Sequence, residues 1–195
     1  MAWDTARTRK SLLDAAVNEF AEYGFEGARV DRIGTRAGVN KERIYQYFGN
    51  KQQLFGHVLE TELERIASAF PVTVEQAADL GDYAGRLYDY HRAHPHFIRL
   101  LHWEGLRDTG GPALNEARRT ETYGARVRAL AEAQRNGTLD PGLDPDALFY
   151  AVLALGAWWF SVPQAVRMIY GGKPGPTSER AALVRLVRRL AGQDR

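Results

Sequence analysis

Apolar residues recur at helical spacing along the chain. Leu13, Ala16, Val17 and Phe20 follow one another at i, i+3, i+4 and i+7, which places them on one face of an α-helix. Gly24 then ends this pattern, since glycine adopts the positive φ that commonly terminates a helix. No stretch alternates apolar and polar residues with period two, and no internal repeat is evident. The pattern therefore predicts an all-α protein without a sheet.

Capping residues and prolines delimit the later helices. Asn50 and Gln53 form a capping pair before a helix that starts at about residue 51, and Thr73 and Gln76 form a second pair. Pro163 should kink or divide a long apolar helix, because proline removes a backbone donor. The predicted helices after the first 50 residues span 51–70, 73–93, Pro95 to before Asp108, 112–135, 145–170, and Thr177 or Ser178 to Leu190.

The stretch from Ala28 to Lys51 holds two short helical patterns around one turn. Val30, Ile33 and Ala37 share a face of the first, and Gly38 suits a turn position with positive φ. Asn40 can cap the second helix, on which Ile44 and Phe48 face inward. Two short helices joined by a tight glycine turn predict a helix-turn-helix, whose second helix can enter a DNA major groove. The residues left to face outward are Lys41, Glu42, Arg43, Tyr45, Gln46 and Tyr47.

Net charge alone does not indicate a nucleic-acid-binding protein. The 195-residue chain carries a formal charge of only +2, and residues 1–51, with nine basic and seven acidic side chains, also carry +2. The distribution is more informative, because Lys41, Arg43 and Lys51 cluster around the second helix of the pair.

The remaining composition indicates a globular protein in a reducing compartment. Hydrophobic residues make up 45% of the chain, and there is no cysteine for disulfides or thiolate chemistry. The first 20 residues are polar and amphipathic, unlike a signal peptide. The longest apolar run, from Ala147 to Val162, is short for a membrane span. We therefore expect a cytoplasmic protein without a membrane partner.

Several of these residues together carry a family resemblance. Tyr23-Gly24-Phe25, Ile33, Ala37-Gly38-Val39, the run Ile44 to Phe48, Lys51 and Leu54 resemble the N-terminal module of the tetracycline-repressor (TetR) family, over roughly residues 7–58. The resemblance implies an all-α protein with a three-helix DNA-binding domain at 1–50 and a larger helical ligand-binding and dimerisation domain at 51–195. It also implies a ligand-responsive transcriptional regulator. The expected form is a homodimeric repressor that a small molecule releases from a palindromic double-stranded operator.

The resemblance implies roles for the outward-facing residues. Base-edge contacts are expected from Asn40, Lys41, Arg43 and Gln46, and phosphate contacts from Tyr45, Tyr47 and Lys51. The side-chain chemistry agrees, because lysine and arginine read guanine, asparagine and glutamine read adenine, and tyrosine hydroxyls donate to phosphate.

The chain departs from the family pattern at the start of the second helix. Ala28 and Arg29 stand where the family usually has threonines, one of which caps this helix. Losing such a cap costs about 0.5–2 kcal/mol. Gly34 replaces a common alanine, and glycine inside a helix costs about 1 kcal/mol. This helix is therefore expected to be locally soft, while Arg29 offers DNA a charged contact.

Aromatic residues gather between Tyr88 and Phe160, where two interpretations stay open. They form an ordinary core, or they line an apolar pocket in which tryptophans supply flat walls and indole N–H donors. The expected effector is apolar or amphipathic. The residues predicted to bind it are Phe97, His102, Trp103, Arg107, Tyr123, Trp158 and Trp159.

Small residues on the apolar helix after Pro145 also fit a subunit interface, because they permit close helix approach. The alternative is a core helix inside one monomer. Adding the last helix would give a symmetric four-helix bundle. The predicted interface residues are Ala147, Ala151, Ala154, Ser161, Leu183, Leu186 and Leu190.

Other function classes find little support in the residues. His91-x-x-His94 has a possible metal-binding spacing, but Pro95 breaks the helix beside it and no clear acidic ligand follows. No nucleophile–base pair or phosphate loop is evident. We expect no catalytic site, no cofactor and no metal. The rival interpretation is a helical small-molecule-binding protein or enzyme with a vestigial helix-turn-helix.

Overall fold

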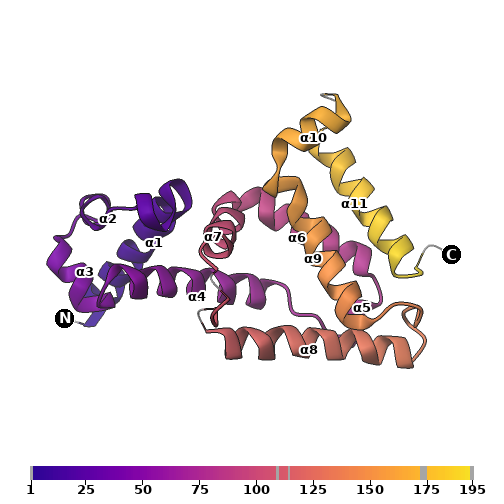
Figure 1. Ribbon diagram of the computed structural model, residues 1–195. Helices are drawn as coiled ribbons and strands as arrows, with labels where there is room; N and C mark the ends of the chain where they lie inside the picture. The colour runs from indigo at the N-terminus through magenta and orange to yellow at the C-terminus, as the bar shows by residue number, and fades with distance from the viewer. Residues whose placement is uncertain (1, 109, 114, 172–174, 194–195) are drawn as a thin grey trace. The chain divides into compact units, whose positions relative to one another are not determined.

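The computed structural model describes residues 2–108, 110–113, 115–171 and 175–193 (Figure 1). Every regular element in these ranges is a helix, which confirms the predicted all-α class. The helices are α1 (Ala2–Gly27), α2 (Val30–Ala37), α3 (Lys41–Phe48), α4 (Lys51–Ala69), α5 (Val74–Ala77), α6 (Leu80–Ala93), α7 (Pro95–Gly105), α8 (Glu116–Arg135), α9 (Pro145–Ser161), α10 (Pro163–Tyr170) and α11 (Pro176–Leu190).

These helices form two compact units. Unit 1 comprises the described residues up to Ile66 and from His96 to Asn115, and unit 2 comprises those from Ala67 to Pro95 and from Glu116 onward. Helix α7 thus belongs to unit 1 from His96 onward, although α6 before it and α8 after it belong to unit 2. The sequence predicts a division of the chain by function, with DNA binding at 1–50 and ligand binding and dimerisation at 51–195. This division stays a prediction.

Unit 1 is built around the apolar face of α1. Phe20 is fully buried and its ring packs edge-on against Phe55 of α4, 5.0 Å between centroids. Ile33 of α2 and Ile44 of α3 close the same core. Helix α1 breaks at Gly24, which has φ 69° and ψ −177°, as the sequence predicts for the end of its regular part.

Buried Glu62 attaches α7 to α4 within unit 1. Its carboxylate lies 2.9 Å from Nε2 of His96 at the start of α7 and accepts a hydrogen bond from Arg65 at 2.6 Å. Phe97, Ile98 and Leu100 of α7 are buried as well. Apolar burial and one buried carboxylate therefore hold α7 in this unit.

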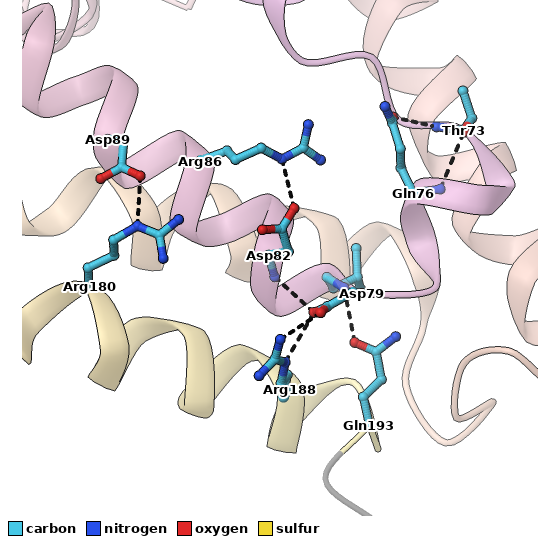
Figure 2. A network of polar contacts seen from close by, with 10 residues as sticks. Thr73, Gln76, Asp79, Asp82, Arg86, Asp89, Arg180, Arg188 and Gln193 are labelled. Atoms are coloured by element: carbon cyan, nitrogen blue, oxygen red, sulfur yellow. Dashed lines mark hydrogen bonds and ion pairs between the residues drawn. The ribbon is translucent and has the colours of Figure 1, made fainter. Parts of the chain in front are cut away.

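In unit 2, charged pairs join α6 and α11 (Figure 2). Arg188 donates to both carboxylate oxygens of Asp79, at 3.1 and 2.6 Å, and Arg180 donates to Asp89 at 2.7 Å. The hydrogen bond from Arg188 holds the pKa of Asp79 below its usual value. Gly81 permits this packing, because a Cβ there would lie 2.6 Å from Cγ of Arg188.

Helix boundaries follow the predicted caps with three corrections. The helix predicted over 112–135 begins only at Glu116, as α8. The Thr73–Gln76 capping box is present, but α5 ends at Ala77 and Asp79 caps the separate helix α6. The last helix begins at Pro176 after Gly175 and has no side-chain cap, so the predicted cap by Thr177 or Ser178 is wrong.

Proline 163 divides the apolar helix into α9 and α10, as predicted. The two helices meet at a bend of 85°. A helix that is apolar nearly all round is expected to be buried, yet Tyr150 is 74% and Trp158 61% exposed in the single chain. Burial is incomplete there because only the side bearing Leu148, Phe149, Val152 and Gly156 faces the unit 2 core. Among the described residues, no single helix is long and apolar enough to cross a bilayer; α9 and α10 pass that test only as a bent pair.

Candidate DNA-binding site

The turn between α2 and α3 has the geometry that the sequence predicts. Gly38 adopts the left-handed conformation, φ 72° and ψ 29°, and its N–H and that of Val39 close the end of α2 on backbone carbonyls. Packing explains the glycine at position 34, which the sequence suggests only as a weak point of α2. A Cβ there would lie 2.7 Å from the carbonyl oxygen of Val39. The close approach of turn and helix requires glycine.

Helix α3 presents a polar face and buries an apolar one. Asn40 caps the helix, its Oδ1 accepting a hydrogen bond from the backbone N–H of Arg43 at 3.1 Å. Ile44 and Phe48 are buried in unit 1. The outward set lies as expected: Lys41, Arg43, Tyr45 and Gln46 are exposed and Tyr47 is half-buried.

Two predicted base readers already have a contact within the chain. The oxygen of Asn40 serves as the cap, which leaves its amide N–H groups for a base. Nζ of Lys41 lies 3.6 Å from Asp31, and both side chains are well exposed. An exposed pair of this kind contributes little, so Lys41 can exchange Asp31 for DNA.

Arg29 at the start of α2 is exposed and provides no side-chain cap, as the sequence predicts. Its backbone N–H instead donates to Oε1 of Glu19 at 2.9 Å. Glu19 is 1% exposed, and the same oxygen accepts from Nε of Arg32 at 2.7 Å. Sequence reasoning missed Glu19 because it belongs to another helix, ten residues earlier.

Lys51, a predicted phosphate contact, lies in the first turn of α4 against the end of α1. Its Nζ is 3.4 Å from the carbonyl oxygen of Glu26 and 4.8 Å from the ring centroid of Phe25. The side chain is half-buried, so it is held in place while its ammonium group keeps donors for a further partner.

The predicted ligand residues fall in both units. Phe97, His102, Trp103 and Arg107 lie in unit 1, where Phe97 is buried and His102 is exposed. Nε1 of Trp103 donates to the carbonyl of Ala21 at 3.3 Å, so this indole N–H already has an acceptor. Tyr123, Trp158 and Trp159 lie in unit 2, the first two exposed and Trp159 half-buried.

An aromatic cluster in unit 2 includes the hydroxyl of Tyr88 and lies beside the imidazole of His91. Neither residue is among the predicted ligand residues. The ring of Tyr88 lies 5.0 Å from Phe160 and 6.2 Å from Trp159, and its hydroxyl donates to Glu179 at 2.6 Å. Burial, and then this hydrogen bond, raise the pKa of Tyr88. Burial also lowers the pKa of neighbouring His91 to about 4, with a further contribution from His94.

Most residues of the predicted dimer interface are accessible in the single chain. Ala147, Ala154 and Leu186 are exposed, and Ala151, Ser161 and Leu190 are half-buried. Leu183 needs correction: its side chain is 0% exposed and belongs to the core, so it offers no surface to a partner. The i, i+3 spacing of Leu183 and Leu186 did not reveal which of the two faces inward.

Metal binding gains no support from the part of the chain that is described. Within it, no three histidine or acidic side chains come together as a metal site requires.

The all-α fold and the exposed polar face of α3 define a helix-turn-helix DNA-binding protein. Residues 12–58 match the family model described as bacterial regulatory proteins, tetR family, and residues 79–189 match the tetracyclin repressor-like C-terminal domain. The chain therefore belongs to the TetR family and is a ligand-responsive transcriptional regulator.

Similar proteins agree with this assignment. The HTH-type transcriptional repressor SCO4008 of Streptomyces coelicolor is 37% identical over 97% of both chains. The crystal structure of the putative transcriptional regulator SCO4942, also from Streptomyces coelicolor, gives a TM-score of 0.83 at 35% identity, covering 94% of this chain and 97% of that one. The fatty acid degradation regulator FadR of Bacillus halodurans shares the fold, with a TM-score of 0.70 at 18% identity over 92% and 97% of the chains.

Proposed function

We propose that this protein is a homodimeric repressor that binds a palindromic operator and leaves it when a small molecule binds. The observation that carries the proposal is the two-faced helix α3, whose buried Ile44 and Phe48 fix it to unit 1 while its polar side chains face outward. A helix held this way can enter a major groove without exposing its apolar face. Such a regulator works in the cytoplasm, where bacterial DNA is.

Residues 1–50 are assigned to DNA recognition, to which Lys51 adds a contact from the start of α4, and residues 51–195 are assigned to the effector and the dimer. Asn40, Lys41, Arg43 and Gln46 read base edges. The phosphate contacts are Arg29, Tyr45, Tyr47 and Lys51. The two half-sites should lie about one helical turn apart, roughly 34–36 Å, or a multiple of that distance.

The dimer forms through the exposed side of α9 together with α11. Exposed alanines at 147 and 154 permit close helix approach, and exposed Trp158 and Leu186 add apolar surface. Large exposed apolar patches mark interaction surfaces in soluble proteins. A second copy of the chain is the partner that covers this side.

The effector is an apolar or amphipathic small molecule that binds in unit 2. Support comes from the aromatic cluster of Tyr88, Trp159 and Phe160, which includes polar groups able to orient a ligand. Trp159 is the predicted ligand residue that lies in this cluster. The effector favours an arrangement of the dimer in which the two α3 helices no longer match the half-site spacing.

Selection from a random duplex library tests the DNA-binding assignment. The wild-type protein should enrich one palindromic sequence. Lys41→Ala and Gln46→Ala should each change the preferred bases, whereas Tyr47→Phe should weaken binding to all sequences alike, because its hydroxyl addresses phosphate. Unchanged sequence preference in both of the former variants would remove them as base readers.

In vitro transcription from a template carrying the selected operator tests the sign of regulation. Added protein should lower transcript yield from this template and leave a template with a scrambled operator unaffected. A rise in yield would make the protein an activator and contradict the repressor assignment.

A further inference from the structure

Two cations from different elements approach one aromatic ring in unit 1. Cζ of Arg107 lies 3.7 Å and Nζ of Lys51 4.8 Å from the ring centroid of Phe25. Lys51 opens α4, whereas Arg107 follows the end of α7, more than fifty residues later. A ring face attracts cations through its quadrupole, so Phe25 gathers two positive charges at the start of α4.

Protein groups satisfy only part of the hydrogen-bonding capacity of these cations. Arg107 donates from Nη2 to Oε1 of Gln52 at 3.0 Å, and Lys51 donates to the carbonyl of Glu26. A guanidinium has five N–H donors and an ammonium three. Within the described part of the chain, these contacts leave several donors of both groups without an acceptor.

The three charged groups that meet here carry a net positive charge. The carboxylate of Glu26 lies 3.9 Å from Nε of Arg107, and its side chain is 87% exposed. Two cations and one carboxylate leave a net charge of +1 (2 − 1). The N-terminus of the 19-residue helix α4 adds partial positive charge to the same place.

We propose that Arg107 contacts phosphate in the operator complex and forms, with Lys51, a two-cation clamp on the DNA backbone. The proposal rests on the proposed function, which already gives Lys51 a phosphate. A phosphate has the acceptor oxygens that both groups lack, and a guanidinium can bind it with two parallel hydrogen bonds. Glu26 is the exposed group that a phosphate displaces. Arg107 is thereby moved from the predicted ligand residues to the DNA interface.

The clamp also connects DNA binding to the segment that carries Arg107. Unit 2 supplies the chain immediately before α7, up to Pro95, and resumes at Glu116. A rearrangement in unit 2 is therefore transmitted covalently to both ends of the segment that holds Arg107. Lys51 is joined to unit 2 from one side only, through α4, which enters that unit at Ala67.

Salt dependence distinguishes a phosphate contact from a packing contact. The probe is a labelled duplex selected with the wild-type protein, and binding is followed by fluorescence anisotropy between about 50 and 200 mM salt. Arg107→Gln should lower the slope of log K against log salt by about 0.9 per contact, hence by about two units for both protomers of a dimer. Arg107→Lys should restore most of the slope, because the charge remains.

Arg99→Gln is the matched control, at an arginine of α7 whose contacts also lie in unit 1. Arg99 donates to the carbonyls of Ala21 and Glu22, at 2.6 and 3.2 Å, so its loss loosens the packing of α7 on α1 without removing a clamp residue. This variant should keep the wild-type slope, whatever its affinity. An equal fall in slope for Arg99→Gln and Arg107→Gln would overturn the clamp.

The outcome separates the clamp from the proposed function. A wild-type slope in Arg107→Gln, with a reduced slope in Lys51→Ala, would overturn the clamp and leave the repressor intact. An unchanged slope in Lys51→Ala as well would remove the phosphate assignment on which the clamp rests. Should Arg107→Gln not fold, Glu26→Gln decides: the clamp predicts tighter DNA binding once the competing carboxylate is gone, and weaker binding would contradict it.

Discussion

Glu19 of α1 accepts a hydrogen bond from the backbone N–H of Arg29, the residue that precedes α2, at 2.9 Å. In an ordinary capping box, an acidic side chain from the third position of the same helix bonds to this N–H. Here a buried carboxylate from a different helix takes that role, while Arg32 neutralises it at 2.6 Å. The start of α2 is therefore fixed by tertiary packing rather than by its own sequence.

Glu19→Ala should destabilise unit 1. The change leaves the N–H of Arg29 and the inner donors of Arg32 without their acceptor, and an unsatisfied buried group costs about 1–3 kcal/mol. Glu19→Gln should cost less, because it keeps an acceptor oxygen. Urea unfolding followed by far-UV circular dichroism measures both changes. Asp14→Ala is the control, since Asp14 pairs with Lys10 on the surface, where such pairs contribute about 0–1 kcal/mol.

Gly24→Ala should destabilise the protein more than Gly38→Asn. Both glycines have positive φ, but ψ at Gly24 is −177°, a region that residues with a side chain rarely occupy, at a cost of about 1–3 kcal/mol. A Cβ at Gly24 would also lie 2.8 Å from the ring of Trp103. Gly38 adopts the left-handed conformation that asparagine tolerates, and a Cβ there meets nothing within 4 Å. Equal melting temperatures for the two variants would contradict this account.

The sequence predicted the fold and the outward face of α3 because both depend on local signals. Gly38, Asn40 and the spacing of Ile44 and Phe48 act within a few residues of one another. Pro163 divided α9 from α10 as expected, because a proline removes a donor whatever surrounds it.

Contacts between distant segments could not be predicted in this way. Glu19 compensates for the missing cap on α2, and nothing in the local pattern of either helix indicates that pairing. Arg107 and Trp103 were grouped with the other aromatic and polar residues by composition, yet their contacts lie in unit 1. Leu183 and Leu186 share an apolar stripe, and only packing against α6 decides which is buried.

Acid should weaken unit 2 through His91. Its pKa falls from 6.5 to about 4 on folding, so the unfolded chain binds a proton that the folded chain excludes as the pH drops through this window. The stability from this group is complete above about pH 6.5 and is lost toward pH 4, in total roughly 3 kcal/mol. Unfolding measured at pH 7 and pH 4.5 should therefore differ less in His91→Leu than in the wild type. Equal pH dependence in the two proteins would show that protonation of His91 does not contribute to the loss of stability in acid.

Ala154→Arg should give a folded monomer. Ala154 is exposed in the single chain, so arginine is tolerated there, but the proposed dimer would bury its charge without a partner. DNA affinity should fall with dimerisation, because one short helix gives few contacts. Ala125→Arg is the matched control, on an exposed position of α8 outside the predicted interface. Analytical ultracentrifugation measures the mass, and a dimeric Ala154→Arg would place the interface elsewhere.

Effector and operator should weaken each other by the same factor. Linkage makes the coupling free energy between two binding sites reciprocal, and about 1–3 kcal/mol corresponds to a roughly 5–150-fold change in affinity. Small amphipathic compounds can be titrated by tryptophan fluorescence, with and without saturating operator. A compound that lowers operator affinity should itself bind more weakly to the operator complex, by an equal ratio.

The same titration locates the effector. Trp159 lies in the aromatic cluster of unit 2, whereas Trp103 bonds to Ala21 in unit 1. Replacing Trp158 and Trp159 by phenylalanine should therefore remove the fluorescence response, while Trp103→Phe should retain it. A response that survives the double replacement and disappears in Trp103→Phe would move the effector to unit 1. Equal effector affinity with and without operator would show that the compound, however tightly bound, is not the ligand that controls DNA binding.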